Sequence, residues 1–127
     1  MAGAKEPITL GAAAGPYSPG IIAGGFIFVS GQLPVSQDTG ELITDDIKAA
    51  VTAALLNVEN VLKAGGAGKE DIVKIVMFLS DIKSFSDANE AYSAFFDGIT
   101  PPARSCFEVA NLPKYAIVEV EAIAVKP

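Results

Sequence analysis

Histidine and tryptophan are absent from this 127-residue sequence, cysteine occurs once, and arginine occurs once beside eight lysines. Without histidine, the chain has no Ser-His-Asp or Cys-His catalytic group and no histidine-ligated metal site. The single Cys106 cannot form an intrachain disulfide or a cysteine-rich zinc site, and it fits a reducing cytoplasm. Acid–base chemistry must therefore use carboxylates, Tyr, Lys, Cys or bound water.

Positive charge and long apolar runs are also scarce. The formal net charge is −6 and the isoelectric point is near 4.5, which argues against a nucleic-acid surface and against an anionic membrane surface. No apolar run approaches the ~20 residues that a membrane-spanning helix needs. Residues 1–7 contain no hydrophobic signal core, so we expect a cytoplasmic protein rather than a secreted one.

Hydrophobic residues, in contrast, are abundant. They make up 50% of the sequence, and the mean hydropathy is +0.41. The length fits one domain over residues 1–127. Because a small monomer buries a modest fraction of its surface, the surplus of apolar residues indicates either a generous core or an obligate oligomer. We favour the oligomer.

The spacing of the apolar residues predicts strands and helices in alternation. Strands are expected at residues 25–30, ended by Gly31, and at 71–80, 103–109 and 117–125. Helices are expected from about residue 44 to the glycine pair at 65–66, and over residues 84–96. Residues 11–20 and 34–40 are rich in Gly and Pro and are expected to be loops. This order favours an α+β domain with both helices on one face of the sheet.

Two local patterns refine this interpretation. Thr44 is a plausible N-cap of the first helix, and Asp45 and Asp46 suit the positive end of the helix dipole. In the strand at 71–80, both alternating sets of side chains are largely apolar, so both faces of that strand should be covered. If the helices cover one face, a symmetry-related copy is the natural cover for the other.

Arg104 is the first candidate for ligand binding. It is the only arginine, and it follows the rigid Pro101-Pro102 pair at the start of a predicted strand. A planar guanidinium holds a carboxylate through two parallel hydrogen bonds, which a lysine cannot reproduce. The alternative is an ordinary surface or ion-paired arginine. Alternation along the strand places Arg104 on the same face as Cys106 and Glu108.

For the other candidates, spacing leaves two interpretations open. Glu119 and Glu121 share one strand face opposite an unbroken apolar set, so they must point away from the core, either to solvent or into an interface. Cys106 is either a small buried hydrophobe or a nucleophile. Tyr17 lies in a Gly- and Pro-rich loop and either packs on the core or covers a ligand. Ser30 is either a strand end or a pocket residue.

The sequence resembles the RidA (YjgF-type) family along nearly its whole length. The most specific stretch is PARSCFEVA at residues 102–110, followed by LP at 112–113 and IVEVEA at 117–122. Supporting matches are GPYS at 15–18, SGQLP at 30–34, TGE at 39–41, NEAY at 89–92 and FF at 95–96. The chain departs from the family in having Pro19-Gly20 where Gln-Ala is common and Asn111 where many members carry a basic residue. These departures bear on substrate preference more than on reaction type.

The resemblance implies a chorismate-mutase-like α+β fold, related to ferredoxin-like domains, in a homotrimer with a central barrel and clefts between subunits. It also implies hydrolysis of reactive enamines and imines, such as 2-aminoacrylate, to 2-oxo acids and ammonia, without cofactor or metal. By the same resemblance, Arg104 binds the substrate carboxylate and Glu119 positions the attacking water. The further matched pocket positions are Tyr17, Ser30, Asn89 and Cys106.

Two other functions are considered. A non-catalytic binder of small carboxylates, with a regulatory role, needs Arg104 but not Glu119. The family's older label of endoribonuclease or translation inhibitor fits poorly with an acidic chain that has one arginine and no histidine. The expected partners are a 2-imino or 2-oxo acid and further copies of this chain, not nucleic acid or membrane.

Overall fold

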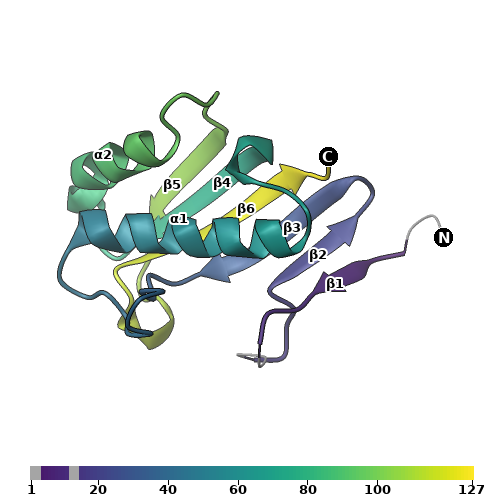
Figure 1. Ribbon diagram of the computed structural model, residues 1–127. Coiled ribbons are helices and arrows are strands. Elements are labelled where there is room, and N and C mark those ends of the chain that lie inside the picture. Colours follow the sequence, from purple (N-terminus) through teal and green to yellow (C-terminus); the bar gives the residue numbers. More distant parts are fainter. Residues whose placement is uncertain (1–3, 12–14) are drawn as a thin grey trace.

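The described residues, 4–11 and 15–127, fold into one mixed sheet with two α-helices on one of its faces (Figure 1). In this computed structural model the strands are β1 (Glu6–Ile8), β2 (Gly20–Ala23), β3 (Phe26–Gln32), β4 (Ile72–Leu79), β5 (Ala103–Glu108) and β6 (Val118–Val125). The helices are α1 (Ile47–Ala64) and α2 (Phe85–Phe95), and short 3-10 turns occur at η1 (Lys69–Asp71), η2 (Ile82–Ser84) and η3 (Pro113–Tyr115).

The strand order is β1-β2-β3-β6-β4-β5, in which β4 and β5 run parallel and the other neighbours run antiparallel. α1 crosses the middle of the sheet and α2 lies near the β5 edge (Figure 1). The predicted α+β arrangement of a mixed sheet with both helices on one face is therefore confirmed. Parallel β4 and β5 require a crossover, which α2 provides.

The first helix starts later than the sequence suggested. Asp46, not Thr44, is the N-cap, and its side chain accepts a hydrogen bond from the backbone N–H of Ala49 at 3.1 Å. The helix proper therefore contains no acidic residue in its first turn. The predicted stop is confirmed: Gly65 is the C-cap, and Gly66 adopts a left-handed backbone with φ of +84°.

The core lies between the helices and the sheet. One alternating set on β6, comprising Val118, Val120, Ala122 and Ala124, is buried beneath the helices as the spacing predicted. The inner side of α2 is also buried; it comprises Ala88, Ala91, Tyr92 and Phe95. Strands and helices thus present one apolar face each to the same core.

The N-terminal part differs most from the prediction. β1 and β2 were not expected, because they are only 3 and 4 residues long and such short runs carry little periodic signal. Gly20, expected in a loop, begins β2. β3 continues through Gly31 to Gln32, and its pairing with β6 shifts register between Val29 and Gln32. Gly31 therefore sits in a β-bulge instead of ending the strand.

The sheet face away from the helices, which we call the open face, is uncovered in a single chain. Phe26 and Phe28 of β3 are 42% and 44% exposed, and Phe107 of β5 is 51% exposed. The expectation that both faces of the strand at 71–80 are covered is thus not met within one chain. β4 buries one alternating set, whereas Val76 and Phe78 on its other side are only partly buried.

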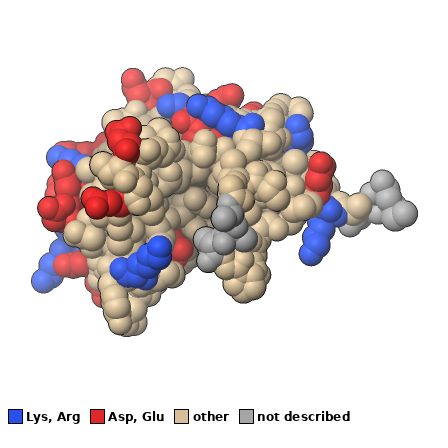
Figure 2. Space-filling model, turned by 60° about the horizontal axis from the view of Figure 1, so that its bottom comes forward, with Lys and Arg blue, Asp and Glu red and all other residues tan. Residues whose placement is uncertain are grey.

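Charged side chains are also unevenly distributed. In the view of Figure 2, Lys, Asp and Glu lie mostly around the margin, and a broad neutral area occupies the middle.

In the part of the chain that the structure describes, no helix combines the length and the apolar character needed to cross a membrane.

Candidate functional site

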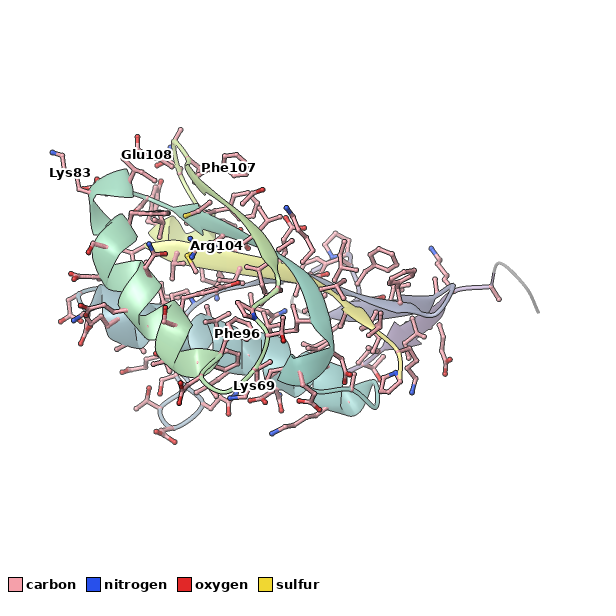
Figure 3. All side chains as sticks on the ribbon, turned by 90° about the horizontal axis from the view of Figure 1, so that it is seen from above. Lys69, Lys83, Phe96, Arg104, Phe107 and Glu108 are labelled. Carbon is pink, nitrogen blue, oxygen red and sulfur yellow. The ribbon has the colours of Figure 1, made fainter. Side chains whose placement is uncertain are left out.

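Arg104 lies on β5 and points to the helix side of the sheet. It is in register with Ile75 of β4, which is completely buried beneath the helices. Its Nη1 donates a hydrogen bond to Asn89 Oδ1 of α2 at 2.8 Å. Its Cζ lies over the rings of Phe85 and Tyr92, 5.4 Å and 4.6 Å from their centroids. Figure 3 shows Arg104 between β5 and α2.

The three residues around Arg104 come from one face of α2. Phe85, Asn89 and Tyr92 are spaced four and three residues apart, so they lie above one another along the helix. Asn89 was expected at the site from the family resemblance, whereas Phe85 was not predicted and no contact of Tyr92 with Arg104 was expected. The spacing of Phe85 and Tyr92 from Asn89 places all three on one helix face. It indicates contact with Arg104 only once β5 is known to lie beside α2.

A cleft of about 620 Å³ opens beside Arg104. Its walls include Asn89, Tyr92 and Phe96 of α2 and the segment from Asp97 to Pro102 that leads into β5. A guanidinium carries five N–H donors, and Asn89 accepts from one of its nitrogens. Further donors of Arg104 are therefore available for a carboxylate.

Two titratable groups near Arg104 stay neutral at physiological pH. Burial raises the pKa of the Cys106 thiol, and the positive charge of Arg104 opposes this only in part. Burial also raises the pKa of Tyr92 to about 12, and the positive charge of Arg104 again opposes the shift only in part. Cys106 is therefore not an activated thiolate, which favours its interpretation as a small residue lining the site.

Glu119 lies on β6 and points to the open face, as the strand alternation predicted. Its carboxylate lies against Gly31, where an added Cβ would come within 2.6 Å of Oε2. The bulge glycine thus leaves room for the carboxylate. Partial burial raises the pKa of Glu119, and the neighbouring negative charge of Glu121 raises it further.

Ser30 lies on the same face as Glu119, and it is bonded to the loop that carries Tyr17. Ser30 precedes the bulge, and its hydroxyl donates to the carbonyl oxygen of Ser18 at 2.6 Å. Its backbone N–H donates to the carbonyl oxygen of Pro19 at 2.9 Å. These bonds fasten the loop that carries Tyr17, whose side chain is 53% exposed.

The candidate residues therefore fall into two groups on opposite faces of the sheet. The helix-side group can bind an anion; it comprises Arg104, Asn89 and Cys106. The open-face group holds a carboxylate with a raised pKa; it comprises Glu119 and Ser30, whereas Tyr17 lies in the loop that Ser30 fastens. Among the described residues, no cluster of three or more Cys, Asp or Glu side chains is arranged to hold a metal ion.

The architecture is that of a small α+β protein with its single arginine on an edge strand, beside a cleft. The family described as Endoribonuclease L-PSP matches residues 8–126, and the chain belongs to this family, which is also called YjgF or RidA.

Three relatives illustrate the similarity. The 2-iminobutanoate/2-iminopropanoate deaminase of Escherichia coli is 45% identical over 117 residues, which is 91% of each protein. A crystal structure of a Rid-family protein of unknown function from Yersinia pestis superposes with a TM-score of 0.90 at 41% identity, covering 96% of this chain and 99% of that one. E. coli TdcF with bound serine gives a TM-score of 0.86 at 40% identity, covering 96% and 97%.

Proposed function

We propose that this protein hydrolyses reactive enamines and imines, such as 2-aminoacrylate and related 2-imino acids, to 2-oxo acids and ammonia. The observation that carries the proposal is the placement of Arg104, which is held by Asn89 beside an open cleft and keeps donors free for a carboxylate. The name of the 45% identical E. coli relative, a 2-iminobutanoate/2-iminopropanoate deaminase, supports the same reaction. The serine bound to TdcF supports a ligand of amino-acid size.

We further propose that the active unit is a homotrimer with its clefts between subunits and a central barrel made from the three open faces. Arg104 and Glu119 lie on opposite faces of one sheet, so a site that uses both needs two chains. The apolar open face supports this arrangement, because it leaves Phe28 and Phe107 exposed in a single chain. A cyclic assembly would place the helix-side edge of one copy against the open face of the next.

In the proposed reaction, Arg104 holds the substrate carboxylate and Glu119 acts on water. An enamine first takes a proton from solvent on carbon and becomes the iminium ion. Glu119 then removes a proton from water as the water oxygen bonds to the iminium carbon, and the C=N electron pair moves to nitrogen, which gives the carbinolamine. Protonated Glu119 returns this proton to the nitrogen, the C–N bond cleaves and ammonia leaves, and the C=O bond forms as the hydroxyl loses its proton to the Glu119 carboxylate. Orientation and one acid–base group suffice, because an imine beside a carboxylate is already electrophilic.

The raised pKa of Glu119 supports its role in both directions of proton transfer. A carboxylate with a raised pKa is a stronger base, so it takes a proton from water more readily. Because its pKa lies closer to the working pH, its protonated form is also accessible there and can return the proton. The neutral thiol of Cys106 and the neutral phenol of Tyr92 leave this work to the carboxylate.

A coupled assay tests the proposal. A serine or threonine dehydratase releases the enamine, and the rate of 2-oxo acid formation is followed with and without this protein. We expect the protein to accelerate imine hydrolysis above the rate in buffer, and we expect Arg104→Ala to abolish the acceleration. Equal rates with and without the native protein would contradict the proposal and favour a non-catalytic carboxylate binder.

RNA cleavage, which the printed family description suggests, has less support. The net charge is −6, and Arg104 is the only arginine of the chain, whereas phosphate binding relies on clustered Lys and Arg.

The single cysteine and the absence of histidine fit the proposed reaction in the cytoplasm.

A further inference from the structure

We infer that Phe85 and Tyr92 are positioning residues that hold the Arg104 guanidinium, together with Asn89, in the orientation that receives a carboxylate. We call these three side chains the α2 clamp. The inference rests on the proposed function insofar as Arg104 is taken to bind the ligand. It adds two residues to the site that neither the sequence motifs nor the relatives' names assign.

The geometry of the clamp is the first argument. Arg104 Cζ lies 4.6 Å from the Tyr92 ring centroid and 5.4 Å from that of Phe85, within the range of cation–π attraction. The Asn89 carbonyl oxygen fixes Nη1 in addition. Three contacts from one helix face therefore restrain the long side chain of Arg104, which would be mobile without them.

The benefit of such restraint is conformational. A free arginine loses much of its rotamer freedom when it binds a ligand, and this loss weakens binding. A guanidinium that is already held loses less, so the carboxylate meets donors in a fixed plane. α2 thus acts on the ligand through Arg104.

Tyr92 acts through its ring and not through its hydroxyl. Its side chain is 7% exposed, and the hydroxyl is buried without a hydrogen-bond partner among the described residues. The same ring also packs in the core, where its centroid lies 4.9 Å from that of Phe96. Removing the ring would therefore disturb both the fold and the contact with Arg104. Tyr92→Phe therefore keeps the clamp and removes only the unpaired hydroxyl.

Phe85 is the better position for a disruptive change. It is the first residue of α2 and is 39% exposed, so Phe85→Leu leaves the core intact. We expect calorimetric affinity for 2-oxobutanoate to fall about three- to tenfold in Phe85→Leu and to stay within about twofold in Tyr92→Phe. KM for the imine should rise by the same factor as the affinity falls, while kcat changes little.

A double-mutant cycle separates positioning from general damage. In an Arg104→Met background, Phe85→Leu should have no further effect on the residual binding of 2-oxobutanoate. The amide of 2-oxobutanoate, which lacks the carboxylate, should bind native protein and Phe85→Leu equally. An equal loss for acid and amide, or a further loss in the Arg104→Met background, would overturn the inference.

The single arginine offers a spectroscopic test that needs no turnover. The chain contains one guanidinium, so one arginine side-chain N–H resonance reports on Arg104 alone. Ring currents should displace this resonance in the native protein. Phe85→Leu should move it towards the position of free arginine, and Tyr92→Phe should not.

An unmoved resonance in Phe85→Leu, or an equal displacement in Tyr92→Phe, would refute the clamp. These outcomes are separate from the coupled assay. A protein that shows the clamp but no imine hydrolysis would refute the proposed function alone, and an active protein without the clamp would refute this inference alone.

Discussion

Arg104 and Glu119 project from opposite faces of the same sheet. Arg104 contacts α2 on the helix side, whereas Glu119 lies against Gly31 on the open face. The two side chains therefore do not meet within one chain. A site that uses both, as we propose, has to combine two copies of the chain.

Replacing Arg104 by lysine should weaken catalysis although the charge is kept. An ammonium group cannot form the paired hydrogen bonds of a guanidinium, so we expect kcat/KM to fall by an amount equivalent to about 1–3 kcal/mol. The measurement is imine hydrolysis in the coupled assay, with circular dichroism and light scattering as controls for folding and assembly. Full activity of Arg104→Lys would show that charge alone suffices.

Glu119→Gln should separate binding from turnover. Glutamine keeps the size of the side chain but cannot accept a proton, so turnover should fall about 10²–10⁴-fold. Calorimetric binding of a 2-oxo acid should persist, because Arg104 is unchanged. Glu121→Gln is the matched control, since Glu121 is the next residue on the same strand face; above the acidic limb of the pH profile it should keep native turnover. Native turnover in Glu119→Gln would show that Glu119 does not act on the attacking water.

The pH dependence of activity should reveal the coupling between the two glutamates. Glu119 works as a base only when ionised, so activity should rise as the pH rises through its pKa. The negative charge of Glu121 contributes to the raised pKa of Glu119. Glu121→Gln removes that contribution and should move the acidic limb of the rate profile to lower pH. A limb that stays in place, or moves to higher pH, would contradict the electrostatic argument.

A charge on the open face should dissociate the assembly. Phe28 is 44% exposed at the centre of β3, and Phe28→Lys would place an ammonium group in the proposed interface. We expect light scattering to give three times the 13.1 kDa chain mass for the native protein and one chain for the variant, with loss of activity. The control is Leu56→Lys on α1, where Leu56 is 40% exposed on the helix side; it should remain trimeric. A native protein that is monomeric at micromolar concentration would defeat the assembly itself.

The sequence predicted the elements that are long and strictly periodic. α1, α2, β4 and β6 were found because each presents a continuous apolar set to one core. β1 and β2 were missed because runs of 3 and 4 residues carry too few repeats. The N-cap was placed two residues early because Thr44 and Asp46 are both good caps, and only the turn of the backbone decides between them.

For the site, alternation placed Glu119 away from the core correctly. It could not place Arg104 relative to Glu119, since that depends on how β5 joins the sheet edge beside β4, a non-local contact. The contacts of Phe85 and Tyr92 with Arg104 were hidden for the same reason.

Subunit mixing tests the central claim most directly. Arg104→Ala and Glu119→Gln are each expected to be nearly inactive alone. If each cleft takes Arg104 from one chain and Glu119 from its neighbour, reassembly of the two variants in equal amounts should restore about one quarter of the native activity per chain, because one cleft in four receives both native residues. If instead both residues serve the same cleft from one chain, or if Glu119 is not used, the mixed sample will show no gain over the separate variants.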